Sequence, residues 1–133
     1  MSIRPSRFTS NITEYKKIIP EAPVLDDAHI ALAFNQIGLL QDQVYIARAQ
    51  QEYAVGKSEE IKSASRLLMF QLQLGQVAVY AYKMAAIKSL SLAKEQSDLF
   101  QVEGYLGGWR HAEHMIQAVN AEIKVRDALD IAR

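Results

Sequence analysis

Apolar residues recur with a helical period after residue 26. One row steps by three or four residues and includes Ile30, Phe34, Ile37, Leu40 and Val44; a second recurs every seven, at Leu32, Leu39, Ile46 and Tyr53. A polar row, His29, Gln36, Gln43 and Gln50, runs beside them. Two apolar rows predict a buried face wider than a two-stranded coiled-coil seam. We expect a helix over residues 26–55, begun by Asp26 or Asp27 and stopped by Gly56.

The next segment is ambiguous, because Phe70, Leu72 and Leu74 alternate with glutamines as a strand would. At about 100° per residue, however, its charged residues and most of its other polar residues share an arc of about 140°. The arc contains Lys62, Arg66, Gln73, Gln76, Lys83, Lys88, Ser91, Lys94 and Glu95. A strand would not gather these residues on one side. The pattern predicts a helix over about residues 58–96, capped by Ser58.

Such a helix would be about 58 Å long at about 1.5 Å per residue. A compact domain of this size is only about 35–40 Å across. Either the helix breaks, at Gly75 or at Ser97–Asp98, or the molecule is elongated. Because an elongated hairpin has too little surface to cover the apolar arc, we expect other chains to complete the core.

A glycine-rich stretch, Gly104, Gly107 and Gly108, predicts a turn before the last helix. That helix is expected over residues 109–133, from Trp109 onward, with one apolar face. The face consists of Trp109, Ala112, Ile116, Val119 and Ile123, and beyond it the stripe is interrupted by Arg126, Asp127 and Asp130. The final turns should therefore pack more loosely.

The first 25 residues form a separate, proline-containing arm, because Pro5, Pro20 and Pro23 are the only prolines of the chain. Within it, Asn11 and Glu14 are spaced as a capping box, which predicts a short helix from Ile12 to Ile19. Together the patterns predict an all-α protein. Residues 26–133 would form an elongated helical hairpin or three-to-four-helix bundle, preceded by the arm of residues 1–25.

Charge and composition narrow the functional classes. Lys plus Arg and Asp plus Glu are 15 each, so the formal net charge is zero, which argues against nucleic-acid binding and permits self-association. The absence of cysteine excludes disulfides and thiolate chemistry. No signal-peptide core and no membrane-length apolar run is present, so we expect a protein that is cytoplasmic or part of a soluble assembly.

Candidate chemistry is sparse. His111 and His114 could share a metal ion, but a usable site needs a third ligand that the neighbouring positions do not offer. No phosphate-binding glycine loop and no nucleophile elbow is present. We therefore expect no enzymatic activity, no cofactor and no small-molecule substrate.

The segment from Arg66 to Leu90 resembles the glutamine-punctuated helix of type III secretion inner-rod subunits, over less than a fifth of the chain and without a diagnostic motif. Small helical components of phage particles fit equally well. We expect a structural or assembly subunit that forms a homo-oligomer or joins a larger complex. The alternatives are a helical adaptor, chaperone, inhibitor or immunity protein and, less favoured, a helical enzyme or metal-binding bundle. Expected contact residues are Leu68, Phe70, Leu72, Leu74, Val79, Tyr80, Tyr82, Ile37, Val44 and Tyr53.

Overall fold

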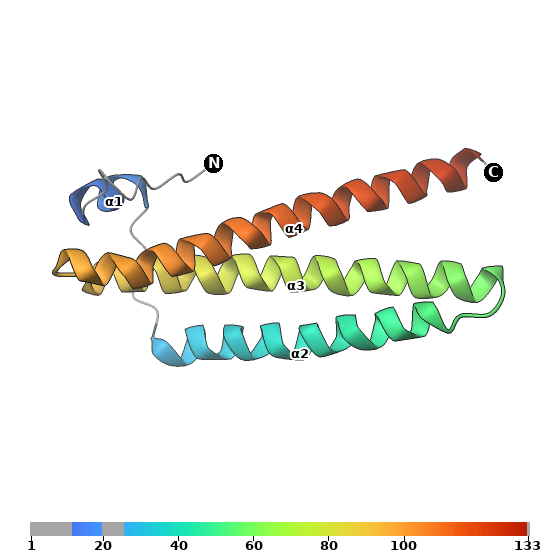
Figure 1. Cartoon of the computed structure of the whole chain (residues 1–133), viewed down its shortest axis with the longest axis horizontal. Coiled ribbons are helices and arrows are strands. Elements are labelled where there is room, and N and C mark those ends of the chain that lie inside the picture. Colours follow the sequence, from blue (N-terminus) through green and yellow to red (C-terminus); the bar gives the residue numbers. More distant parts are fainter. Residues whose placement is uncertain (1–11, 20–25, 133) are drawn as a thin grey trace.

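The computed structural model describes residues 12–19 and 26–132, and every regular element in those ranges is a helix. Successive long helices run antiparallel, and the central one lies between the other two (Figure 1). The elements are α1 (Ile12–Ile18), α2 (Asp27–Glu52), α3 (Lys57–Leu92), the 3-10 turn η1 (Gln96–Asp98) and α4 (Leu99–Ala132). The predicted all-α, elongated bundle is confirmed. The predicted cap Asn11 and the three prolines lie outside the described residues.

The start of α2 follows the prediction, and its end does not. Asp26 is the N-cap, and its side chain accepts a hydrogen bond of 2.9 Å from the backbone N–H of His29. The helix ends at Glu52, with Tyr53 as C-cap. Gly56 is therefore not its stop. With a φ of 87°, a region that favours glycine, it precedes α3 instead.

The predicted Ser58 cap is also wrong, because α3 begins one residue earlier, at Lys57. Gly56 occupies the N-cap position, no side chain caps this end, and the Gly56 carbonyl accepts a 3.1 Å hydrogen bond from the N–H of Glu60. Glu59 and Glu60 lie in the first turn, where the helix dipole favours acidic residues.

α3 continues without interruption through Gly75 and ends at Leu92, not near Gln96. Its 36 residues span about 54 Å. It stops because Asp98 caps the next turn: the carboxylate accepts hydrogen bonds from the backbone N–H groups of Lys94 and Glu95, at 2.9 and 3.1 Å. The long polar helix thus breaks over residues 93–95, a few residues before the predicted place at Ser97–Asp98, and not at Gly75.

The predicted glycine turn is wrong. α4 begins at Leu99, ten residues before Trp109, and Gly104, Gly107 and Gly108 lie inside it. Each helical glycine costs about 1 kcal/mol relative to alanine. That cost is outweighed here by tertiary packing, because Val102 and Leu106 on the same turns are fully buried.

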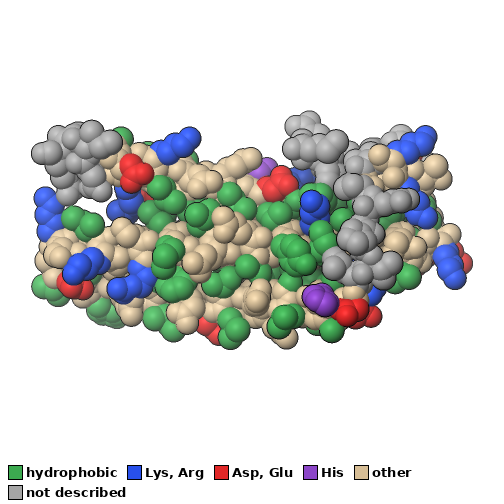
Figure 2. Space-filling view, turned by 180° about the vertical axis from the view of Figure 1, so that it is seen from behind, with side chains coloured by type: hydrophobic (Ala, Val, Ile, Leu, Met, Phe, Trp, Pro, Cys, Tyr) green, Lys and Arg blue, Asp and Glu red, His purple; other side chains and the backbone are tan. Residues whose placement is uncertain are grey.

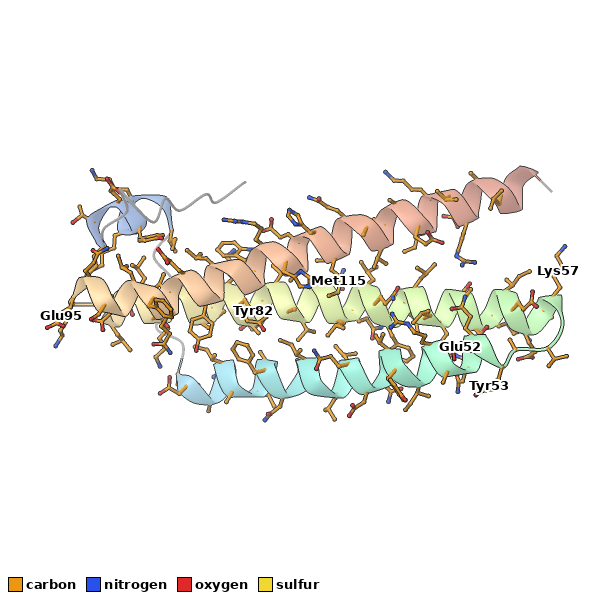
Figure 3. The ribbon with its side chains drawn as sticks, viewed as in Figure 1. Glu52, Tyr53, Lys57, Tyr82, Glu95 and Met115 are labelled. Carbon is orange, nitrogen blue, oxygen red and sulfur yellow. The ribbon has the colours of Figure 1, made fainter. Side chains whose placement is uncertain are left out.

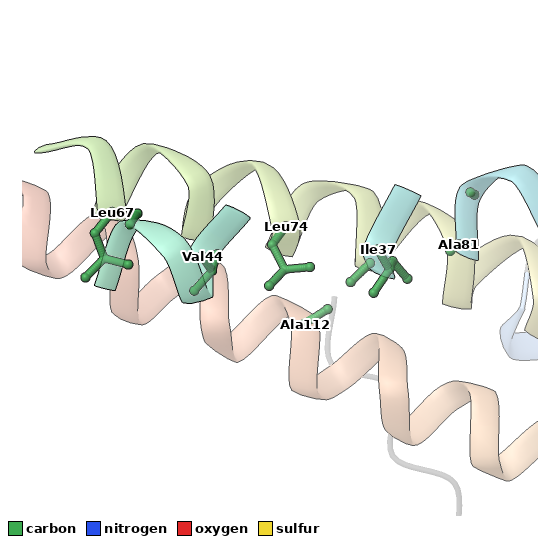
Figure 4. Packing of buried hydrophobic residues seen from close by; sticks show 9 residues of the cluster. Ile37, Val44, Leu67, Leu74, Ala81 and Ala112 are labelled. Atoms are coloured by element: carbon green, nitrogen blue, oxygen red, sulfur yellow. The ribbon is translucent and has the colours of Figure 1, made fainter. Parts of the chain in front are cut away.

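The core consists of two clusters along α3. One joins α2, α3 and α4, and Figure 4 shows Leu67 and Leu74 of α3 beside Val44 of α2 and Ala112 of α4. The other lies at the α3–α4 hairpin, where Tyr15 and Ile19 cover Ala86, Ile87, Leu90, Leu99, Val102 and Leu106. The side chains of Tyr15 and Ile19 are therefore buried by this hairpin.

Candidate interaction surface

The seven-residue apolar row of α2 is exposed. Inner residues such as Ala33, Ile37, Val44 and Ala47 are buried against α3. The second row, which we call the outer stripe, remains 48–82% exposed: Leu32 58%, Leu39 66%, Ile46 48% and Tyr53 82%. On a helical projection the two rows lie about 150° apart, so the outer stripe faces away from the bundle.

This placement corrects the sequence-based expectation that both rows form one buried face. α2 packs along α3 and has little direct contact with α4, so only one of its rows finds a neighbour. In the space-filling view hydrophobic side chains project along the edge formed by α2 (Figure 2). Figure 3 shows Tyr53 at the far end of this helix, pointing away from α3.

The face that carries the outer stripe contains almost no charge. By projection, Asp42 is its one charged residue between Leu32 and Tyr53, and the positions beside the stripe are mainly glutamine. From α3, Arg66 reaches the edge of this face, because its guanidinium donates a 2.8 Å hydrogen bond to Gln50 Oε1, whereas Lys62 is exposed on α3 itself. Depletion of charge around large apolar side chains is characteristic of the buried centre of protein interfaces.

A groove of about 540 Å³, which we call the main groove, lies between α2 and α4 over α3. Its floor is the α3 segment from Ala64 to Leu74, and its walls come from both outer helices. It is lined by Val44, Arg48, Gln51, Ala64, Leu67, Leu68, Gln71, Leu74, Met115, Ala118, Val119, Glu122 and Arg126. In the middle of the bundle, Figure 3 places Met115 at the α3–α4 contact.

A second groove of about 370 Å³ adjoins the main groove, where the C-terminal half of α4 diverges from α3 (Figure 1). Ile61, Met69 and Leu129 line it, and all three are more than 40% exposed. Leu68 and Arg126 line both grooves. α4 diverges from α3 where its apolar stripe ends, beyond Ile123. At this point Arg126 pairs with Glu122 of α4 itself and not with a residue of α3.

Charges at the main groove are unevenly paired. On the α4 wall, Arg126 Nε lies 3.3 Å from Glu122 Oε1. On the α2 wall, Arg48 has neither an ion pair nor a hydrogen bond within the described ranges, and the same holds for the amide of Gln71 on the floor. The groove therefore offers one uncompensated positive charge and one amide with unused hydrogen-bonding capacity.

The predicted contact residues divide into three groups. Ile37, Val44, Leu68 and Leu74 are buried within the chain, so α3 finds much of its cover in α2 and α4. Four are partly buried, of which Phe70, Val79 and Tyr82 pack on the core and Leu72 lines the second groove. Tyr53 and Tyr80 are exposed. Leu32, Leu39 and Ile46 were not among the predicted contact residues, although their glutamine neighbours were a signal that this row faces water.

His111 and His114 are both exposed on α4. Among the described residues, no three His, Asp or Glu side chains are grouped closely enough to bind a metal ion together. Within the same ranges, no helix combines the length and apolar character that crossing a bilayer requires.

Comparisons with protein-family models, with curated protein sequences and with solved structures find no match for this chain.

Proposed function

We propose that this protein is a non-enzymatic helical assembly subunit that self-associates, or packs into a larger protein complex, through the outer face of α2. The observation that carries the proposal is the outer stripe: four large side chains at seven-residue spacing, exposed on a face to which α2 contributes one charged residue. Helices that pack side by side along their length carry apolar residues at such a seven-residue repeat. A secretion apparatus or a phage particle is the kind of assembly to which we propose that such a subunit belongs.

Burial of the outer stripe against another chain would release enough free energy for association of moderate affinity. Full burial of one such side chain contributes about 1.5–3 kcal/mol, and the stripe residues are about half to four-fifths exposed before association. Association costs several kcal/mol in lost freedom, which offsets much of this gain. We therefore expect self-association that depends on concentration in the micromolar range.

Sedimentation velocity over a concentration series tests the proposal. The wild-type protein should show a mass that rises with concentration, and Leu32→Ser/Leu39→Ser/Ile46→Ser should remain monomeric with its helical content preserved. Leu92→Ser/Phe100→Ser is the matched control, because both side chains are highly exposed and lie outside α2, where α3 ends and α4 begins. This control should associate like the wild type.

A wild-type chain that stays monomeric at every concentration would contradict self-association. The alternative, an adaptor, chaperone, inhibitor or immunity protein that binds one partner, would then be favoured, and the main groove is the feature that supports it.

A further inference from the structure

We propose that the outer stripe of one copy docks into the main groove of the next copy, so that the subunits associate head to tail. This inference rests on the proposed self-association and names the two surfaces that meet. The two surfaces lie on different sides of α2, since Val44, Arg48 and Gln51 line the groove and the outer stripe faces away from α3. One molecule can therefore use both at the same time.

Charge complementarity identifies a second copy as the occupant. Asp42 is the one charged residue, and the one acid, that α2 contributes to the stripe face, and Arg48 is the unpaired cation on the groove wall. Neither side chain has an ion pair or hydrogen bond in the part of the chain that the structure describes. Docking would bring the unpaired acid of one surface to the unpaired base of the other, while Glu122 and Arg126 already neutralise each other on the opposite wall.

The dimensions of the two surfaces agree. Leu39 and Ile46 flank Asp42, and seven helical residues correspond to about 10.5 Å. The groove floor from Ala64 to Leu74 spans about 15 Å, so it can accept these two side chains together. Gln43, beside Asp42, would supply hydrogen-bonding groups to the unpartnered amide of Gln71.

A contact between two different surfaces has a consequence for the form of the assembly. Head-to-tail contacts generate a ring if the rotation closes, and an open filament if it does not. Symmetric pairing of α2 with α2 of a second copy would instead stop at a dimer and leave Arg48 unpaired in an empty groove. The mass at high concentration therefore distinguishes the two arrangements.

Charge reversal tests the docking. Asp42→Arg and Arg48→Asp should each weaken self-association by about tenfold or more, because each places like charges together. An equimolar mixture of the two variants should associate again, since every stripe then meets a groove of opposite charge. The double variant Asp42→Arg/Arg48→Asp should associate with itself. Lys62→Asp reverses a charge that is also exposed but lies on α3, and it should leave self-association at the wild-type level.

Sedimentation velocity gives the masses, and circular dichroism should show wild-type melting for each variant, because Asp42 and Arg48 are exposed. If the wild type associates but neither single variant weakens it, or if the mixture fails to recover, the docking is wrong and the proposed function stands. A wild-type mass that stops at two copies also overturns the docking. A monomer at every concentration overturns the docking together with the self-association on which it rests.

Discussion

Gly108 of α4 lies against the ring of Tyr82 of α3 so closely that a Cβ atom at Gly108 would be 2.4 Å from Tyr82 Cδ1. The ring is fixed by its neighbours, because it makes an edge-on contact with Phe34 at 5.2 Å between centroids and a tilted contact with Tyr105 at 6.5 Å. The glycine therefore sets the distance between the two helices.

Gly108→Ala should lower the free energy of unfolding by about 1–3 kcal/mol, because the added methyl group overlaps a ring that has little room to move. The gain in helix propensity, about 1 kcal/mol, reduces this loss. Urea unfolding measures the change. Gly107→Ala is the control: no atom lies within 4 Å of its added Cβ, and the variant should be stabilised by about 0.4–1 kcal/mol. Equal shifts in both variants would contradict the packing role of Gly108.

Gly75→Ala should also destabilise the protein, by about 1 kcal/mol, because a Cβ there would lie 2.6 Å from Ile116 Cγ1. The close approach of α4 outweighs the gain in helix propensity that alanine would otherwise bring. In an Ile116→Ala background the same change should become neutral or stabilising. A double-mutant cycle by urea unfolding measures the coupling, and additive effects would contradict the contact.

Tyr15→Phe should loosen the attachment of α1. The Tyr15 hydroxyl donates a 2.9 Å hydrogen bond to Glu103 Oε1, and the side chain is 1% exposed. Losing a hydrogen bond to a carboxylate costs about 1.5–3 kcal/mol. Amide hydrogen exchange in α1 should accelerate by about tenfold or more, with little change in the middle of α3. Unchanged exchange in α1 would show that the apolar contacts alone hold it.

Acidification should weaken the α3–α4 hairpin. The backbone N–H groups of Lys94 and Glu95 hold the pKa of Asp98 below its ordinary value of 3.8. Because the folded pKa is depressed, the stabilisation is complete above the unfolded pKa and is lost as pH falls through the folded value. Asp98→Asn should melt at a lower temperature near neutral pH, and its melting temperature should fall less than that of the wild type below pH 4. Parallel curves for the two proteins would contradict this role.

The fold class could be predicted because one-sided polar patterning, as from Lys62 to Lys88, has no counterpart in a strand. The start of α2 followed from Asp26, whose capping bond depends on local sequence alone. The start of α4 could not be predicted, because Gly108 functions through Tyr82, 26 residues away in the sequence. The candidate surface was only half predictable: periodicity reveals the row at Leu39, but not whether a neighbour from the same chain covers it.

Both α2 and α4 pack along α3, while the backbones of α2 and α4 lie farther from each other and meet mainly through side chains such as Phe34 and Tyr105. Thermal opening of the bundle is therefore not uniform in space: the end bearing Ile61 and Leu129 can fray while the hairpin, secured by Val102 and Leu106, keeps its shape. Such a molecule has one rigid end and one compliant end, so a neighbour that inserts at the compliant end can adjust the helix spacing without unfolding the subunit.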